Sequence, residues 1–439
     1  MSDITLLERI PSLASTLSPQ TWPFALSWLP QAAYLVGGNV RDALLGRSAE
    51  YLDLDFVLPT QAVETARAIA KHYQAGFVLL DAERQIARVV FDKATVDFAQ
   101  QVGDSLEEDL QRRDFTVNAI AYHPMTEHLL DPLQGYADLQ KGLIRMIAPE
   151  NLKEDPLRLL RAYRQSAQLG FALESCTQDT IRQLAPLLQF IAAERIQAEL
   201  NYLLSTARAT PFLTEAWTDG LLAHWLPSAT PDNVALLGAI DQAAIALENL
   251  WSVFGTELTA WARDQPRTSG TRRSWLKVAK LACLVDPSPE RAESELWHLK
   301  YSRLEIQAVV TILKALPYVR QTALTDLSRR EQYYFFREVG AVFPSLTVLA
   351  VALGAPVEAI APLMERFLNP NDPVAHSVPL LTGRDLMQAL NLSPGPQIGH
   401  LLDAIHLAQA EGFVTNRETA LEFAKRHLDG EVQEPIGLK

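Results

Sequence analysis

Short apolar runs alternate with polar segments in the first third of the chain. Runs of strand length, rich in β-branched and aromatic residues, lie at 32–37, 52–59, 75–81, 86–92 and 94–100. Asp92 and Lys93 stand where the last two runs are expected to form a hairpin. Between the second and third runs, residues 61–73 carry apolar side chains at the spacing of an amphipathic helix. This pattern predicts an α+β fold for the first third of the chain.

After about residue 150 the apolar spacing becomes helical. The periodic segments are rich in Leu and Ala, and proline-bearing stretches interrupt them at 226–233, 285–291 and 368–379. No fixed-period repeat or low-complexity tract is evident. We therefore expect an α+β part followed by purely helical parts, with boundaries that give 1–145, 146–225, 226–370 and 371–439.

Composition narrows the class of protein. The chain has 439 residues, of which 48% are hydrophobic, so it can bury a substantial core. No apolar run reaches the roughly 20 residues that span a bilayer, and the start of the chain lacks a signal peptide. Cys176 and Cys283 are isolated, which suits a reducing compartment. We expect a cytoplasmic protein without a membrane partner or an evident obligate protein partner.

Net charge restricts the possible partners. The formal net charge is −13, which disfavours a general nucleic-acid binder. Any polyanion must therefore meet a local basic surface. Such a surface is a candidate at 263–280, where six basic residues accompany one acidic residue. We expect Arg267, Arg272, Arg273 and Lys277 to contact an RNA backbone there, although a solvated helix edge has the same composition.

Two carboxylates converge in the run YLDLDFVL. On a strand Asp53 and Asp55 project to the same face, where they can hold a divalent cation such as Mg²⁺ that also binds a nucleoside triphosphate. Asp97 is a third candidate if its strand lies beside theirs. Taken alone, this spacing is common on half-exposed strands that bind nothing.

The stretch VGGNVRD places Gly37 and Gly38 at a turn from strand to helix. Glycine there lets a phosphate approach the backbone, and Arg41 can add a charged fork. The pattern is neither GxGxxG nor a Walker loop, so it gives no support to a dinucleotide-binding protein or a P-loop ATPase. A tight turn with a surface ion pair is the structural alternative.

The block EEDLQRRDFTVNAIAY concentrates polar groups. Arg113 can meet a phosphate or a base, while Asp114 and Asn118 can bond ribose hydroxyls. The alternative is a charged helix start with Asp114 as its cap.

The block KEDPLRLLRAYRQ predicts a helix with proline in its first turn. Glu154 and Asp155 then lie beside Arg158, at i,i+4 and i,i+3 spacing. If Asp155 and Arg158 face a base, they complement the amino donor and ring-nitrogen acceptor of cytosine or adenine and reject uracil and guanine. Intrahelical ion pairs on an amphipathic helix are the alternative.

Four blocks in order, GGNVRD, DLD, RRDFTVNAIA and EDPLRLLRAYR, resemble the class II tRNA nucleotidyltransferases. This family comprises CCA-adding, CC-adding and A-adding enzymes and bacterial poly(A) polymerases. AAERIQAEL at 192–200 resembles the mainly structural helix motif that follows, and 380–421 is more weakly similar to the C-terminal segment of bacterial members.

The resemblance implies a polymerase-β-like nucleotidyltransferase head, with a mixed sheet and helices, followed by an all-α neck, body and tail that hold tRNA. It implies transfer from CTP or ATP to the tRNA 3′ end without a nucleic-acid template, by a two-metal mechanism. The implied residues are Asp53 and Asp55 for Mg²⁺; Gly38, Arg41 and Arg113 for the triphosphate; Asp114 for the ribose; and Asp155, Arg158, Arg161 and Arg164 around the base.

Two departures from the family pattern matter. Gln165 stands where many members have Phe, which bears on local packing more than on chemistry. Only FAQQVGDSLEEDLQ separates Asp97 from Arg112, whereas CCA-adding members carry a longer flexible segment there. The short segment resembles the CC-adding subgroup; full CCA addition, A addition and poly(A) synthesis remain alternatives.

Rival functions explain less of the sequence. A nucleotidyltransferase of another group would account for DLD but not for the later blocks. A non-catalytic RNA-binding protein would not need both Asp53 and Asp55.

Overall fold

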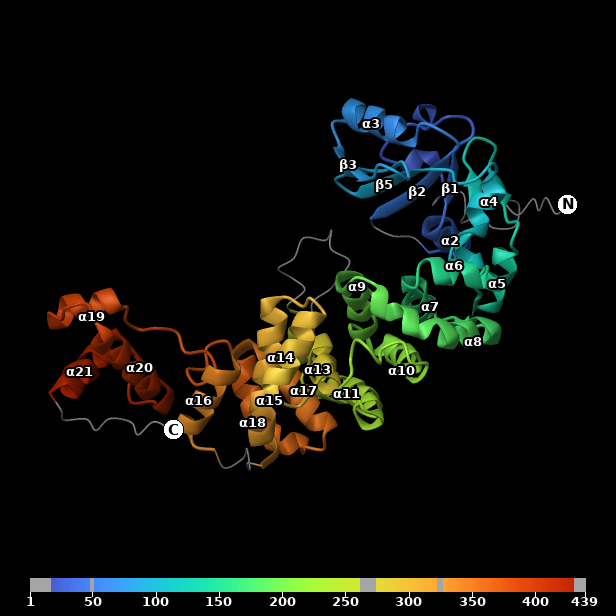
Figure 1. The fold of residues 1–439 in the computed structure, drawn as a ribbon. Helices are drawn as coiled ribbons and strands as arrows, with labels where there is room; N and C mark the ends of the chain where they lie inside the picture. Colours follow the sequence, from blue (N-terminus) through green and yellow to red (C-terminus); the bar gives the residue numbers. More distant parts are fainter. Residues whose placement is uncertain (1–16, 48–50, 261–273, 322–326, 430–439) are drawn as a thin grey trace. The chain divides into compact units, whose positions relative to one another are not determined.

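The computed structural model describes residues 17–47, 51–260, 274–321 and 327–429, and these form two compact units (Figure 1). Unit 1 comprises residues 1–199 and 215–224, and unit 2 comprises residues 200–214 and 225–439. The α+β part and most of the next predicted part thus lie in unit 1. The finer division into four parts stays a prediction.

A mixed sheet organises unit 1. Its strand order is β3-β4-β5-β2-β1-β6-β7, with β2 parallel to β5 and the other neighbours antiparallel. The strands are β1 (Tyr34–Val36), β2 (Leu52–Leu58), β3 (Gly76–Asp81), β4 (Ile86–Phe91), β5 (Ala94–Gln100), β6 (Ala121–His123) and β7 (His128–Leu130). All five strands expected from the sequence form, and Phe91 pairs with Ala94 across the expected hairpin. The sequence analysis missed β6 and β7, which are short.

Alternation along β2 gives the sheet one apolar and one acidic face. Leu54 and Phe56 are buried, and Phe56 stacks on Phe98 of β5 with ring centroids 5.5 Å apart. Helix α3 (Ala62–Tyr73) packs against β4 and β5 (Figure 1). The other face carries Asp53 and Asp55, so the hydrophobic packing of one face fixes the direction of the carboxylates on the other.

Helices complete unit 1. They are α2 (Gly38–Leu44), α4 (Leu106–Gln111), α5 (Gly135–Lys141), α6 (Pro149–Glu154), α7 (Leu157–Leu169) and α8 (Ser175–Leu184). Helices α9 (Ala193–Leu204) and α10 (Thr210–Thr218) belong partly to unit 1 and partly to unit 2. A small second sheet pairs β8 (Leu143–Ile144) with β9 (Ala172–Leu173). Leu106 and Leu110 of α4 pack with Val57 of β2, directly beyond the carboxylates.

The described part of unit 2 beyond α9 and α10 consists of helices, as the Leu- and Ala-rich spacing predicts. They are α11 (Pro231–Leu250), α12 (Ser252–Ala260), α13 (Trp275–Leu284), α14 (Pro289–His298), α15 (Arg303–Gln321), α16 (Arg329–Val339), α17 (Phe343–Ala352), α18 (Val357–Leu368), α19 (Gly383–Leu390), α20 (Pro396–Glu411) and α21 (Arg417–Leu428). The last three share a separate apolar cluster around Leu386, Leu401 and Ile405. The proline-bearing stretches at 285–291 and 368–379 begin where α13 and α18 end.

One stretch of unit 2 is apolar and long enough to cross a membrane by length and composition. It runs from Arg329 to Ala352, and 67% of its apolar window is buried inside the protein. Burial of this kind is typical of a core helix in a folded domain.

Candidate active site

Two neighbouring strands bring three acidic residues to one face. β2 and β5 run parallel, with Asp53 opposite Thr95 and Asp55 opposite Asp97. Residues paired across neighbouring strands share a face of the sheet, so all three carboxylates point the same way. Thr95 Oγ1 donates a hydrogen bond to Asp53 Oδ1 at 2.6 Å. From the sequence, Asp97 is a candidate only if its strand lies beside the strand of Asp53 and Asp55. The pairing of β5 with β2 meets this condition.

Negative charge accumulates at Asp55. Burial, followed by the charges of Asp53 and Asp97, raises the pKa of Asp55 from 3.8 to about 7. In the described part of the chain, no three His, Cys, Asp or Glu side chains are grouped so as to hold a metal ion on their own. The carboxylate pair therefore fits a hard cation that takes its other ligands from substrate and water, as Mg²⁺ does.

Asp97 has a different environment from the other two. Arg88 of β4 donates from Nε to one of its oxygens and from Nη2 to the other, both at 2.7 Å, and this hydrogen bonding raises the pKa of Arg88. Both oxygens of Asp97 are thus engaged by one guanidinium, so its catalytic role stays a prediction. The sequence analysis missed Arg88, although the predicted hairpin at Asp92 and Lys93 already implies that Arg88 stands opposite Asp97.

The glycine turn touches the acidic face. Gly37 has φ of 79°, in the region that favours glycine, and α2 begins at the next residue. A Cβ on Gly37 would lie 3.3 Å from Asp55 Oδ2 and 3.6 Å from Arg113 Nη1. The turn therefore brings bare backbone against both an acidic and a basic group of the site.

Arg41 lies on α2 with only 9% of its surface exposed. Its Nε and Nη2 donate to the two oxygens of Asp42 at 2.9 and 3.1 Å, and its Nη1 donates to Asn118 Oδ1 at 2.7 Å. A guanidinium has five N–H donors, so these three bonds leave two free for a ligand. The structure thus holds Arg41 in a fixed orientation beside the glycine turn.

Arg113 is the second basic group near the glycine turn. Its Nη2 donates to Asp109 Oδ2 at 3.4 Å, one turn earlier along the chain. Its Nε is buried without a hydrogen-bond partner among the described residues. Asp109 Oδ1 also accepts from the backbone N–H of Val102 at 3.1 Å, so one carboxylate connects Arg113 to the segment that follows β5.

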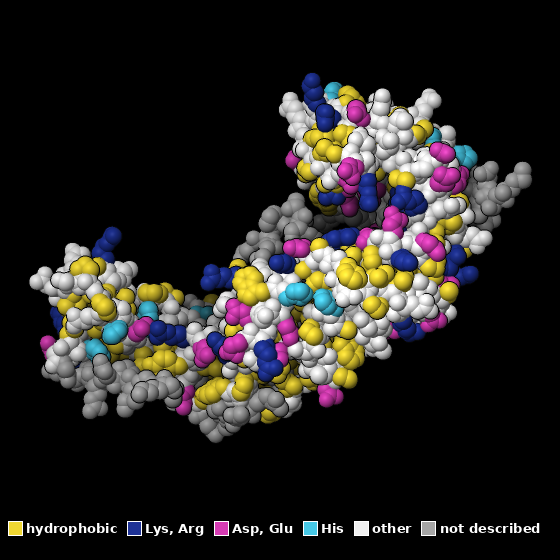
Figure 2. Space-filling model, viewed as in Figure 1, with side chains coloured by type: hydrophobic (Ala, Val, Ile, Leu, Met, Phe, Trp, Pro, Cys, Tyr) yellow, Lys and Arg dark blue, Asp and Glu magenta, His cyan; other side chains and the backbone are white. Residues whose placement is uncertain are grey.

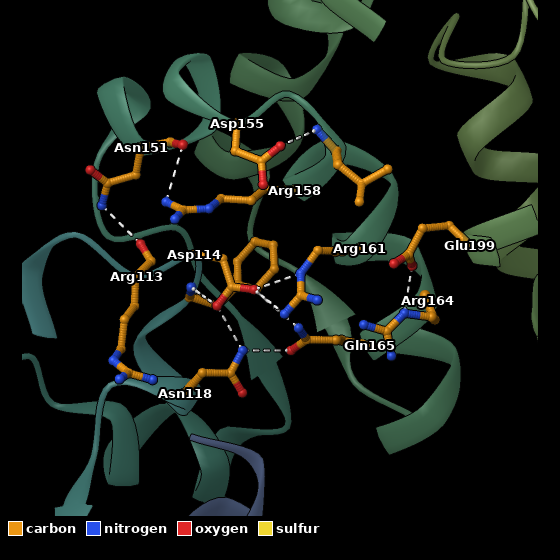
Figure 3. A network of polar contacts seen from close by, with 12 residues as sticks. Arg113, Asp114, Asn118, Asn151, Asp155, Arg158, Arg161, Arg164, Gln165 and Glu199 are labelled. Carbon is orange, nitrogen blue, oxygen red and sulfur yellow. Dashed lines mark hydrogen bonds and ion pairs between the residues drawn. The ribbon is translucent and has the colours of Figure 1, made fainter. Parts of the chain in front are cut away.

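Asp114 lies at the centre of a buried polar network (Figure 3). Arg161 donates to its Oδ2 from Nε and Nη2 at 3.0 and 2.8 Å, while Asn118 Nδ2 and the Phe115 N–H donate to its Oδ1 at 2.8 and 2.9 Å. Burial opposes ionisation, but the charge of Arg161 and these hydrogen bonds lower the pKa of Asp114 to about 2. Asp114 is thus held as a buried carboxylate with both oxygens hydrogen-bonded, and its contact with a ribose stays a prediction.

The predicted pairing of acid and guanidinium at the start of α7 is wrong. α6 ends at Glu154 and Asp155 is extended, so one continuous helix does not run through Pro156. Glu154 pairs with Arg112 at 3.0 Å, and Asp155 pairs with Arg195 of α9 at 2.8 Å. The break at Asp155 removes the helical spacing that the i,i+3 and i,i+4 pairs require.

Arg158 is held by backbone carbonyls. Its Nη1 donates to the carbonyl oxygen of Arg112 at 2.8 Å and to that of Asn151 at 3.1 Å. Figure 3 shows the bond to Asn151. Asp155 Oδ1 accepts the N–H of Leu157 at 3.3 Å, which fixes the acid at the first turn of α7. Asp155 and Arg158 therefore lie on the same short segment with donor and acceptor atoms to spare.

Arg164 faces away from the Asp114 network. It pairs with Glu199 of α9 (Figure 3). Its Nη1 donates to Gln168 Oε1 at 2.9 Å. Two residues of the 192–200 stretch make these contacts: Arg195 pairs with Asp155, and Glu199 pairs with Arg164. This agrees with the mainly structural role expected for the stretch from its sequence.

Two cavities open next to these residues. One of about 470 Å³ is lined by residues that include Gly38, Arg41, Asp53, Asp55 and Arg164. The other, of about 540 Å³, is lined by residues that include Val57, Gln101, Arg113, Glu154 and Arg158. Figure 2 shows acidic and basic side chains gathered around a hollow on this part of unit 1.

The basic patch predicted at 263–280 is only partly described. Arg267, Arg272 and Arg273 lie outside the described residues. Lys277 is corrected: its side chain is 0% exposed and pairs with Glu305, with Asn201 Oδ1 as a second acceptor at 3.1 Å. A side chain enclosed in this way cannot reach an RNA backbone, and the sequence hid this because α13 is buried on every side from Lys277 to Leu284, its two lysines included.

Comparisons with known proteins match three parts of the chain to family models. Residues 33–145 match the family described as the Poly A polymerase head domain, 170–232 the RNA and SrmB binding site of polymerase A, and 271–424 tRNA nucleotidyltransferase domain 2. A CC-adding tRNA nucleotidyltransferase from Synechocystis sp. is 48% identical over 92% of this chain and 96% of its own length.

More distant relatives carry other names. A CC-adding tRNA nucleotidyltransferase from Geobacter sulfurreducens is 32% identical over 90% of this chain and 92% of its own length. An A-adding tRNA nucleotidyltransferase from Deinococcus radiodurans is 33% identical, with coverage of 90% and 96%. A solved CCA-adding enzyme in complex with ATP shares the fold, with a TM-score of 0.68, 20% identity and 91% coverage of each chain.

Proposed function

The chain belongs to the class II tRNA nucleotidyltransferase family, and from that membership we propose that it is a CC-adding enzyme. It would transfer CMP from CTP to the 3′ end of tRNA without a nucleic-acid template. Identity of 48% to a CC-adding relative supports this subtype. The partners are then tRNA and CTP, and the enzyme works in the cytoplasm.

The structural observation that carries the proposal is the short connection after β5. β5 ends at Gln100 and α4 begins at Leu106. Asp109 Oδ1 accepts the N–H of Val102 at 3.1 Å, and Glu108 Oε2 accepts the N–H of Asp104 at 2.9 Å. A segment this short, tied at two points to the first turn of α4, has little freedom to remodel the pocket for a second base.

The reaction follows from the residues on the acidic face. The tRNA 3′-oxygen forms a bond to the α-phosphorus of CTP, the bond from that phosphorus to the bridging oxygen breaks, and pyrophosphate leaves with the hydroxyl proton passing to solvent. Enzymes of this family generally use a divalent metal ion. We take it to be Mg²⁺ held by Asp53 and Asp55, where it would lower the pKa of the attacking hydroxyl and stabilise charge on the phosphate.

The surrounding residues bind and orient CTP. Gly38, Arg41 and Arg113 meet the triphosphate, since the two guanidinium groups lie beside the glycine turn with N–H groups to spare. Asp114 orients the ribose. Asp155 presents an acceptor and Arg158 a donor to the edge of cytosine. Uracil would leave both groups without hydrogen-bond partners, which lowers the affinity for UTP relative to CTP.

Unit 2 and the helical end of unit 1 would hold the body of the tRNA. The division into head, neck, body and tail at 145, 225 and 370 belongs to this proposal, as does the contact of Arg267, Arg272 and Arg273 with the RNA backbone. Reversing Arg272 and Arg273 to Glu should weaken tRNA binding and flatten its dependence on salt. Unchanged binding would eliminate the patch.

The direct test uses purified protein and defined tRNA ends. One tRNA ends before CCA and a second ends in CC, and each is incubated with labelled CTP or labelled ATP. A CC-adding enzyme extends only the first tRNA, and only with CTP. Addition of A to the CC-ended tRNA would show an A-adding or CCA-adding enzyme, and a growing A tract would show a poly(A) polymerase.

A further inference from the structure

Gln165 of α7 is almost completely enclosed, with 2% of its surface exposed. From the sequence alone, Gln165 is expected to affect local packing more than chemistry. In the structure its amide instead joins the Asp114 network: Oε1 accepts from Asn118 Nδ2 at 2.9 Å, and Nε2 donates to Asp114 Oδ2 at 3.3 Å (Figure 3). A polar side chain this deeply buried destabilises the fold unless its hydrogen bonds are made.

The two bonds fix the orientation of the Asn118 amide. An Asn side chain has two N–H donors and one carbonyl acceptor. One N–H of Asn118 goes to Asp114 Oδ1 at 2.8 Å and the other goes to Gln165 Oε1. With both donors committed on that side, the Asn118 carbonyl must face the opposite way, where Arg41 Nη1 meets it at 2.7 Å.

Gln165 cannot take the reverse orientation without loss. Turning its amide over would set its N–H groups against the N–H of Asn118 and its carbonyl against the Asp114 carboxylate. The arrangement Asp114, Asn118, Gln165 therefore has one hydrogen-bonding solution, and a Phe at position 165 would leave the second Asn118 N–H without that acceptor.

We propose that Gln165 is a positioning residue that fixes Asn118 and, through it, aims the Arg41 guanidinium at the triphosphate of CTP. This inference rests on the proposed function, because it assigns CTP to the site. Gln165 belongs to α7, the helix that begins with the base-selecting segment, whereas Arg41 belongs to α2 at the glycine turn. Gln165 thus connects the two halves of the nucleotide site through two hydrogen bonds, one to Asn118 and one from Arg41 to Asn118.

The test compares the affinity of the protein for CTP with its affinity for CMP, by calorimetry without tRNA. Gln165→Met keeps the length of the side chain but removes both polar groups. Of the two hydrogen bonds that Gln165→Met removes, the neutral one to Asn118 is the one that acts on Arg41, and its loss predicts about tenfold weaker binding of CTP. CMP binding should stay within twofold, because CMP lacks the phosphates that Arg41 meets, and the preference for CTP over UTP should not change.

A second variant keeps the proposal testable if Gln165→Met does not fold. Gln165→Glu preserves the shape of the side chain and the acceptor for Asn118, but places a second carboxylate beside Asp114. Because Asn118 keeps its acceptor, this variant should weaken CTP binding less than Gln165→Met does. The matched control is Gln183→Met, an exposed glutamine on α8. Thermal unfolding of each variant is recorded, and binding is compared only among proteins with a cooperative transition.

A double-mutant cycle separates positioning from packing. In an Asn118→Ala background, Gln165→Met should cause no further loss of CTP affinity, because Gln165 acts through Asn118. An equal loss in both backgrounds would overturn the proposal, and so would parallel losses of CTP and CMP affinity. Failure of the wild-type protein to extend tRNA would refute the proposed function instead, while the ratio of CTP to CMP affinity would still report on Gln165.

Discussion

Buried pairs of opposite charge occur in both units of the protein, and their surroundings differ. In unit 1 the Arg161 and Asp114 side chains pair at 2.8 Å, with the Arg161 side chain 35% exposed. In unit 2 Lys277 and Lys280 are 0% exposed and pair with Glu305 and Asp241. The first pair belongs to a network beside open cavities, whereas the other two are enclosed among helices.

The residue types suit these two roles. A guanidinium has five donors in a fixed plane, so Arg41 and Arg161 can hold a protein carboxylate or amide and still bind a ligand. A buried ammonium has three donors, and Lys280 uses two of them on the Thr206 carbonyl and on Thr210 Oγ1, at 3.2 and 2.6 Å, besides its pairing with Asp241. The comparison predicts that substitutions at the candidate active site of unit 1 change nucleotide binding or catalysis, whereas those at the buried lysines change stability alone.

The largest expected effect is on catalysis at the acidic face. Asp53→Ala removes a carboxylate that would hold the metal ion, and nucleotide addition to tRNA should fall by about 10³ or more, since metal catalysis contributes several kcal/mol. Incorporation of labelled CMP measures it, with circular dichroism as the check on folding. A variant that still extends tRNA at a tenth of the wild-type rate would refute the metal assignment.

The next effect, on stability, belongs to unit 2. Lys277→Met leaves Glu305 buried without its cation, and the free energy of unfolding should fall by about 3–5 kcal/mol. Urea denaturation measures the loss, and CTP affinity of the folded fraction should not change. The double variant Lys277→Met with Glu305→Leu should recover most of the stability. A fall in CTP affinity with stability intact would show that the comparison is wrong.

Local sequence patterns predict some of these contacts and not others. The alternation in YLDLDFVL sufficed to place Asp53 and Asp55 together, and hairpin geometry implied that Arg88 faces Asp97. The partner of Asp155 is Arg195, forty residues later, and such pairings depend on tertiary packing that no local pattern encodes. Lys277 was misassigned for the same reason, because a basic residue on a helix does not reveal which face is buried.

A smaller effect concerns pH and the metal-free protein. Asp55 has its pKa raised from 3.8 to about 7, so the native state binds this proton more tightly than the unfolded chain. The resulting stability is complete below pH 3.8 and is lost as the pH rises through about 7. Urea denaturation at pH 5 and pH 8 should differ by about 2 kcal/mol more in wild type than in Asp55→Asn. Equal pH dependence in the two proteins would contradict the origin of the shift.

Asp114 should behave in the opposite sense. Its pKa is lowered to about 2, so its contribution to stability is present above pH 3.8 and is lost as the pH falls toward 2. Acid unfolding of Asp114→Asn should therefore begin from a lower stability at pH 6 and change less between pH 4 and pH 2. An acid transition identical to that of wild type would argue against the strong pairing with Arg161.

The smallest effect is expected at the surface of unit 1. Asp179 pairs with Arg182 at 2.8 Å, but its side chain is 64% exposed. Asp179→Ala should change the free energy of unfolding by less than about 0.5 kcal/mol, because solvent screens exposed pairs. Thermal unfolding of Asp179→Ala and Lys277→Met under the same conditions compares the two losses of stability. A loss comparable to that of Lys277→Met would remove the distinction between exposed and enclosed charges.

The most direct measurement of the central claim is the sequence of the tRNA 3′ end after reaction. A tRNA that ends before CCA is incubated with the wild-type protein and with both CTP and ATP, and the products are sequenced. The account predicts ends that stop after two added cytidines, with no extension by Asp53→Ala. Ends that carry a terminal adenosine would contradict it.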